Sequence, residues 1–163
     1  MSMRDDFDFE RALKEALDAI DIGPHCSCAD ITMEILRVNL PLRWRTARYA
    51  ASGFGGGVGG SGGPCGAFSA GLIAYALAVG ERDEPEGCIT ELVEGGAQTY
   101  FDDWMARFAS ISCAQLSGYP SLRAEAVREE FFNSGGVQRC TDNYIRFAVE
   151  KILTLAPSAE SGP

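Results

Sequence analysis

Residues 53–79 read GFGGGVGGSGGPCGAFSAGLIAYALAV, a glycine-rich segment followed directly by an apolar run. The glycines of residues 53–64 exclude a regular element, because glycine loses more conformational freedom on ordering than any other residue. Residues 65–79 are apolar almost all round, which predicts a buried central helix that begins near Cys65. Because both flanks of the loop are apolar, we expect it to lie inside one domain, where its backbone approaches other groups closely.

Apolar residues repeat at helical spacing on both sides of this segment, and no alternating apolar run indicates a strand. The spacing predicts helices over about residues 6–21, 28–40, 42–52, 65–79, 89–109, 122–132 and 137–155, with a short turn at 113–116. The expected fold class is therefore an all-α, single-domain bundle of about five to seven helices. We expect the domain to cover residues 1–156, followed by a disordered tail at 157–163.

The chain of 163 residues carries a net charge of −9. That charge argues against binding to nucleic acid or anionic lipid, both of which need a basic face on the protein. The most apolar stretch, residues 67–79, is too short to span a bilayer, and the N-terminal residues lack the apolar core of a signal peptide. We therefore expect a cytoplasmic protein with no membrane partner.

Six cysteines and a single histidine, His25, set the range of chemistry open to the chain. In a reducing cytoplasm the cysteines are not expected to form three structural disulfides, so metal binding or redox chemistry is the better interpretation. Burial of each cysteine as a small apolar residue stays an alternative. One histidine excludes two-histidine zinc sites and C-x-x-C-H haem attachment, and any Cys–His catalysis would have to use His25.

Four of the cysteines are expected where a helix begins: Cys28, Cys65, Cys113 and Cys140, the last in the first turn of the final helix. A helix N-terminus carries unpaired N–H groups and a partial positive charge, which favour a thiolate. Cys65 has the strongest case, because the preceding glycines can turn several N–H groups toward its sulfur and lower the thiol pKa. The long separations match no zinc pattern, so spacing alone leaves open a shared site or four unrelated core cysteines.

The other two cysteines are weaker candidates. Cys26 lies two residues before Cys28, so the two do not share a helical face, but Cys26 can approach the same site from just before the helix. Cys88 follows an acidic loop and is expected to be incidental or a distant redox partner.

Four stretches of the sequence, in order, match the cysteine contexts of a known family. GFGGGVG (53–59) and GPCGAFSAG (63–71) are similar to its central motif. Cys28 with Ala29 resembles its first cysteine, CAQLSGY (113–119) its third, and Cys140 its fourth. Over about residues 28–155 the chain thus resembles the C_GCAxxG_C_C family, which is named for this cysteine pattern and assigned a redox role.

The resemblance implies a helical protein that binds an iron–sulfur cluster (2Fe–2S or 4Fe–4S), for electron transfer or chemistry at the cluster. A related domain occurs beside a haem module in split-Soret cytochromes, and this chain, without C-x-x-C-H, would be the cluster domain alone. The redox partner protein or small-molecule substrate is not identified, and a homodimer is expected. The implied metal ligands are Cys28, Cys65, Cys113 and Cys140, with Cys26 as a further candidate and Gly62, Gly63 and Gly66 as backbone donors to the cluster.

Two other functions stay open from the sequence. In a metal-free thiol–disulfide or sulfur-handling protein, Cys65 would attack and Cys28 or Cys113 would resolve the mixed disulfide. In a purely structural helical module, replacement of Cys65 would change only stability. The number of cysteines that converge separates these hypotheses, because two suffice for thiol exchange whereas a cluster needs three or four.

Overall fold

The computed structural model describes residues 6–20, 27–40, 42 and 45–156, and within them it contains eight α-helices and no β-strand. The all-α class is therefore confirmed. The helices are α1 (Phe9–Ala19), α2 (Cys28–Asn39), α3 (Gly66–Gly80), α4 (Glu86–Phe108), α5 (Cys113–Ser117), α6 (Glu125–Asn133), α7 (Gly136–Cys140) and α8 (Arg146–Leu155). Two 3-10 turns, η1 (Arg45–Ala50) and η2 (Ser52–Phe54), precede α3, and a π-helical turn, η3 (Thr141–Ile145), joins α7 to α8.

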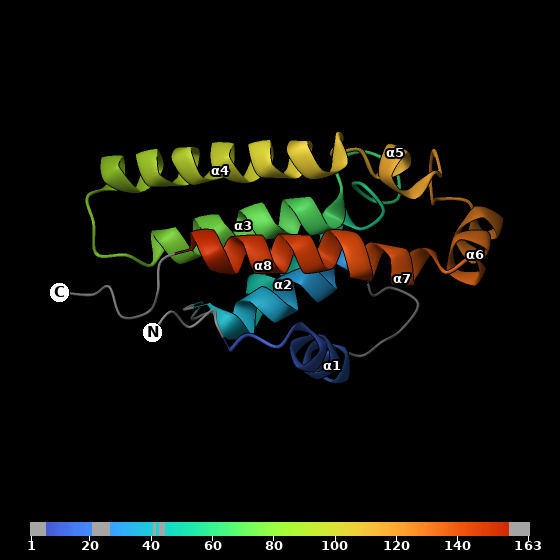
Figure 1. Ribbon diagram of the computed structural model, residues 1–163, viewed down its shortest axis with the longest axis horizontal. Coiled ribbons are helices and arrows are strands. Elements are labelled where there is room, and N and C mark those ends of the chain that lie inside the picture. The colour runs from blue at the N-terminus through green and yellow to red at the C-terminus, as the bar shows by residue number, and fades with distance from the viewer. Residues whose placement is uncertain (1–5, 21–26, 41, 43–44, 157–163) are drawn as a thin grey trace.

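Helix α3 is the central element, as its apolar sequence predicts. It packs against α2, α4 and α8, and in Figure 1 α4 lies on one side of α3 and α8 while α2 and then α1 lie on the other. Small buried residues on α3, including Ala67, Ala70 and Ala74, allow its neighbours to approach closely. The C-terminal end of α7, the start of α2 and the loop before α3 all meet at one end of the bundle.

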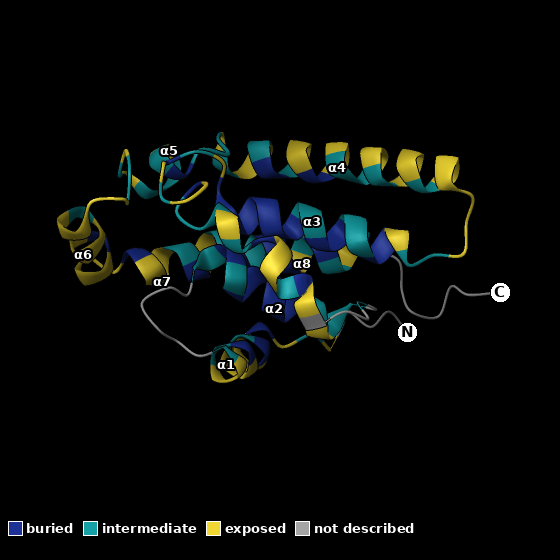
Figure 2. Ribbon diagram, turned by 180° about the vertical axis from the view of Figure 1, so that it is seen from behind, coloured by how far each residue is buried: buried dark blue, intermediate teal, exposed yellow. Residues whose placement is uncertain are grey.

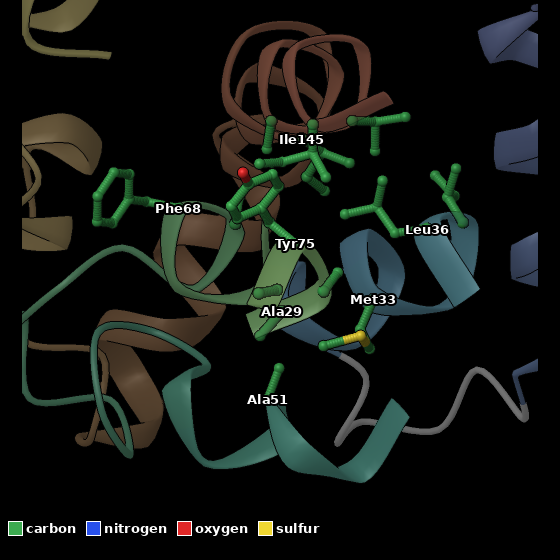
Figure 3. Packing of buried hydrophobic residues seen from close by; sticks show 14 of the residues in the cluster. Ala29, Met33, Leu36, Ala51, Phe68, Tyr75 and Ile145 are labelled. Carbon is green, nitrogen blue, oxygen red and sulfur yellow. The ribbon is translucent and has the colours of Figure 1, made fainter. Parts of the chain in front are cut away.

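The hydrophobic core fills the space around α3. Figure 3 shows side chains of this core from α2, α3 and η3, among them Met33 and Ile145, while Phe68 points to the other side of α3. Helix α4 contributes Tyr100 and Trp104, both fully buried, and the ring of Phe68 stacks on Tyr100 with centroids 5.0 Å apart. Figure 2 shows that the opposite side of α4 is exposed, which is the amphipathic pattern expected for this helix.

The structure corrects two of the expected helices. Residues 42–52, expected to form an α-helix, form the turns η1 and η2 instead, and residues 41, 43 and 44 lie outside the described residues. The last helix is not regular, because η3 interrupts it after Cys140. The expected tail at 157–163, together with His25 and Cys26, also lies outside the described residues. In the described part of the chain, no helix combines the length and apolarity needed to cross a membrane.

Candidate functional site

Cys28 is the first residue of α2, as predicted, and a reciprocal cap holds it there. The Ser27 N–H donates to the Asp30 carboxylate (2.9 Å), and the Asp30 N–H donates to the Ser27 hydroxyl (3.3 Å). The Ser52 hydroxyl also donates to Asp30 (2.5 Å), which ties the segment before the glycine loop to the start of α2.

The glycine loop has a left-handed backbone. All five residues from 56 to 60 have positive φ values, between 56° and 77°. Four of them are glycines, which adopt this conformation without a steric cost, and the fifth is Val58. The loop closes on itself, since the N–H groups of Gly62 and Gly63 donate to the carbonyls of Gly56 and Gly57 (3.1 and 3.0 Å). The amides of Gly62 and Gly63 are therefore engaged within the loop.

The loop also brings Cys65 and Cys113 together. The Cys65 N–H donates to the Ile111 carbonyl and the Cys113 N–H donates to the Gly63 carbonyl, both at 2.7 Å. These two hydrogen bonds flank an isolated antiparallel bridge between Pro64 and Ser112. Cys65 caps α3 and Cys113 opens α5, so both lie at helix N-termini as predicted.

Two glycines pack directly against cysteines, and Gly57 also packs against the backbone of Gly63. A Cβ atom on Gly66 would lie 2.8 Å from the Sγ of Cys28, and one on Gly57 would lie 2.7 Å from the Cβ of Cys113. Both distances are far below van der Waals contact, so side chains at these positions would displace the cysteines.

Cys140 reaches the same region in a different way. The helix begins at Gly136 and Cys140 is its fifth residue, so Cys140 lies just past the first turn in which it was expected. Cys140 directly precedes η3, and π-helical turns of this kind occur frequently at functional sites. The Tyr144 hydroxyl donates to the Leu116 carbonyl (2.9 Å) and so links η3 to α5.

The four cysteines line one small cavity of about 10 Å3, which is close to the least that a single water needs. The remaining wall consists of Leu116, Ser117 and Tyr144. No group of three or more His, Cys, Asp or Glu side chains in the described ranges is arranged to hold a single metal ion. Cys88, near the start of α4, is exposed and does not line this cavity.

A hydrogen bond joins the thiols of Cys28 and Cys65 and shifts their pKa values in opposite directions. The Cys65 thiol donates a hydrogen bond to Cys28, and this bond, with backbone N–H donors from Gly56, Ala67 and Ala29, lowers the Cys28 pKa to about 7 against the effect of burial. The same hydrogen bond and burial raise the pKa of Cys65 well above its ordinary value. The lowering expected for the Cys65 pKa thus falls on its partner Cys28, because Cys65 donates the hydrogen bond between the two thiols.

The other two thiols stay protonated at neutral pH. Burial, followed by repulsion from a charged Cys28, raises the pKa of Cys113 to about 11. The same two causes, with repulsion from Cys113 added, raise the pKa of Cys140 to about 12. In the metal-free protein Cys28 therefore ionises more readily than Cys113 and Cys140.

Sequence reasoning missed three groups that surround the thiols. Ser117 hydrogen-bonds the Cys113 thiol and Tyr144 lines the cavity, and each lies four residues after a cysteine in a helical segment. The i, i+4 spacing along a helix is the signal that could have identified both. The N–H donor Gly56 has no such signal, because its position depends on the fold of the loop.

A second cavity, of about 450 Å3, adjoins the first. Cys28, Cys113 and Cys140 line both cavities. Its other walls come from the glycine loop, the start of α2, the segment before α6, and α6 and α7. The thiols therefore lie between the packed bundle on one side and a larger space on the other.

The family model described as "Putative redox-active protein (C_GCAxxG_C_C)" matches residues 26–155. The matched range contains the glycine loop and every cysteine that lines the small cavity. No curated protein and no solved structure matches the chain. With four cysteines in the family's order, converging on one cavity, the chain belongs to the C_GCAxxG_C_C family of redox-active proteins.

Proposed function

We propose that this protein binds an iron–sulfur cluster through Cys28, Cys65, Cys113 and Cys140 and uses it in a redox reaction. One observation carries the proposal: four thiols from widely separated segments line a single cavity. Unrelated core cysteines would be dispersed through the interior.

The donor set suits a cluster better than a single metal ion. Four thiolates are the usual ligands of both two-iron and four-iron centres. Sulfide bridges separate the irons of a cluster, so its protein sulfurs are spread more widely than the ligands of one ion. No group of three or more His, Cys, Asp or Glu side chains in the described residues is arranged to hold a single ion, so the choice of a cluster rests on the donor chemistry alone.

The chain supplies the surroundings that tune such a centre. Amides of Gly56 and Ala67 donate to Cys28, and amides of Ala67 and Phe68 donate to Cys65, so both sulfurs are held by hydrogen bonds that favour the anionic form. Tyr144 and Leu116 close one wall against solvent. A bound cluster would supply one-electron transfer, or a substrate position at any iron that lacks a protein ligand.

Anaerobic reconstitution with iron and sulfide tests the proposal. We expect a brown protein with bound iron, acid-labile sulfide and an EPR signal after reduction. In Cys65→Ala the iron content should collapse while the helical circular dichroism is mostly kept, because one ligand is lost from an otherwise packed bundle.

Cys88→Ala is the matched control, since Cys88 is exposed and away from the cavity. We expect unchanged iron in that variant. Full iron binding by Cys65→Ala, or loss of iron in Cys88→Ala, would contradict the assigned ligands. The expected homodimer and the unidentified redox partner stay predictions.

Metal-free thiol–disulfide exchange is a second candidate, favoured by the hydrogen-bonded pair of Cys28 and Cys65. Cys28, with the lower pKa, would attack one sulfur of a disulfide substrate and release the other as a thiolate. Cys65 would pass its proton to that thiolate and displace the bound substrate from Cys28. The second substrate sulfur would leave as a thiolate and take a proton from solvent, so that the substrate departs as a dithiol and the protein is left with a Cys28–Cys65 disulfide. A colourless protein that binds no iron but forms this disulfide would favour the second candidate.

A further inference from the structure

The cavity of about 450 Å3 beside the thiols has the size of a small-molecule site. Its lining differs from that of the small cavity, where all four thiols meet. Cys28, Cys113 and Cys140 form one of its walls, so any molecule that enters it can reach sulfur. Its opposite side opens outward, because Phe132 and Val137 are 46% and 41% exposed.

The charge of this cavity is opposite to that of the molecule. Arg123 and Arg128 line it, whereas no aspartate or glutamate does, in a chain of net charge −9. The Arg123 Nε donates to the Gly59 carbonyl (3.1 Å), which anchors that side chain to the glycine loop. In the described part of the chain, the Arg128 guanidinium has neither an ion pair nor a hydrogen bond. Asp30 lies behind the wall, where the hydroxyls of Ser27 and Ser52 donate to it.

Besides the arginines, the thiols, Ser27, Ser52 and the loop glycines, the wall is apolar and partly rigid. Phe131 is buried, and its ring packs so closely on Gly136 that a Cβ there would lie 2.3 Å away. Tyr119 packs edge-on against the same ring, with centroids 5.7 Å apart. These contacts fix α6 at the mouth of the cavity, and they leave Phe132 and Leu122 available to an apolar ligand.

We infer that this cavity binds a small organic anion. Its acidic group would contact Arg128 and Arg123, and its apolar part would pack against Phe132 and Leu122. Two arginines with no carboxylate beside them in the lining favour binding of the acidic group, and the apolar side chains of the wall favour binding of the apolar part of the ligand. The assignment of this ligand as the substrate of the redox centre rests on the proposed function. The binding site itself does not require a cluster.

The probe is anilinonaphthalene sulfonate, an aromatic anion whose fluorescence rises on binding, and phenylnaphthylamine is its neutral counterpart. We expect the reduced, metal-free full chain to bind the sulfonate at one site. Arg128→Gln should weaken sulfonate binding about tenfold and leave the neutral compound unchanged, because a charge-assisted contact is lost. Arg107→Gln, an equal charge change on α4 away from the cavity, should have no effect.

Two measurements test where the sulfonate binds: protection of a thiol from alkylation, and substitution of a residue in the apolar wall. Saturating sulfonate should slow alkylation of Cys28 by iodoacetamide, and Phe132→Ala should weaken binding of both compounds. Equal affinity of Arg128→Gln and the unchanged protein for the sulfonate, or unprotected Cys28, would overturn the inference. Because every arm uses metal-free protein, a protein that takes up no iron can still bind the anion, so the two proposals can fail separately.

Discussion

Two tyrosines between α3 and α4 show how a single hydroxyl can stabilise or destabilise the fold. The Tyr75 hydroxyl donates to the Leu92 carbonyl (3.0 Å). The Tyr100 hydroxyl is buried against Gly71 without a hydrogen-bond partner in the described part of the chain. A buried polar group without a partner keeps the full cost of its lost hydration, whereas a paired one recovers it.

We therefore expect Tyr100→Phe and Tyr75→Phe to have opposite effects. Removing the unpaired hydroxyl of Tyr100 should raise the free energy of unfolding by about 1 kcal/mol, and removing the paired hydroxyl of Tyr75 should lower it by about 1 kcal/mol. Urea denaturation of the reduced, metal-free variants measures both. A destabilised Tyr100→Phe would mean that this hydroxyl has a partner, such as a buried water.

At the scale of one element, α4 contains two adjacent glycines with different roles. Gly95 is exposed, and a Cβ there would meet nothing within 4 Å. At Gly96, a Cβ would lie 2.1 Å from the ring of Tyr75. Gly96 thus lets α3 and α4 approach closely, whereas Gly95 only lowers the helix propensity of α4.

Alanine substitution separates the two glycines. Gly95→Ala should raise the free energy of unfolding by about 1 kcal/mol, the propensity difference in a helix interior. Gly96→Ala should lower it by about 2 kcal/mol, because the Tyr75 ring must move and its hydrogen bond to Leu92 is strained. Thermal melts followed by circular dichroism measure both, and a stabilised Gly96→Ala would contradict the close packing of these helices.

At the scale of the whole molecule, a chain of net charge −9 nevertheless buries one carboxylate in its core. Glu34 on α2 is 2% exposed, and both of its oxygens accept from Arg37 (2.7 and 2.9 Å). These hydrogen bonds lower the Glu34 pKa below its ordinary value of 4.5 against the effect of burial, and the charges of Arg37 and Arg48 add to the shift.

A carboxyl group whose pKa is lower in the folded protein than in the unfolded chain stabilises the fold at pH values above its unfolded-state pKa. This stabilisation is lost as the pH falls through its folded-state pKa. Glu34→Gln should therefore lower the free energy of unfolding by about 1–3 kcal/mol at pH 7, and the difference should shrink below about pH 4.5. Denaturant unfolding at a series of pH values measures it. The control is Glu15→Gln, because the ion pair of Glu15 with Arg11 is exposed and long (3.9 Å). If the effect of Glu34→Gln on the free energy of unfolding did not depend on pH, the ion pair of Glu34 with Arg37 would be contradicted.

Local patterns determined the helices and the contexts of the cysteines. The apolar residues of α3 and the stripe of Tyr100 and Trp104 on α4 follow helical periodicity, so both helices and their buried faces could be predicted. The positions of Cys28 and Cys113 at helix starts follow from similar local signals. These features depend on neighbours within about one turn of helix, and such neighbours can be read from the sequence.

Only the tertiary structure decided what the cysteines meet. The lowered Cys28 pKa depends on the Cys65 thiol and on amides from three segments, including Gly56, which converge only after folding. The arginine-lined cavity likewise arises where distant segments pack together, and the π-helical turn after Cys140 interrupts a regular helical periodicity in the sequence. Sequence periodicity carries no distances between remote segments, and both pKa values and cavities depend on those distances.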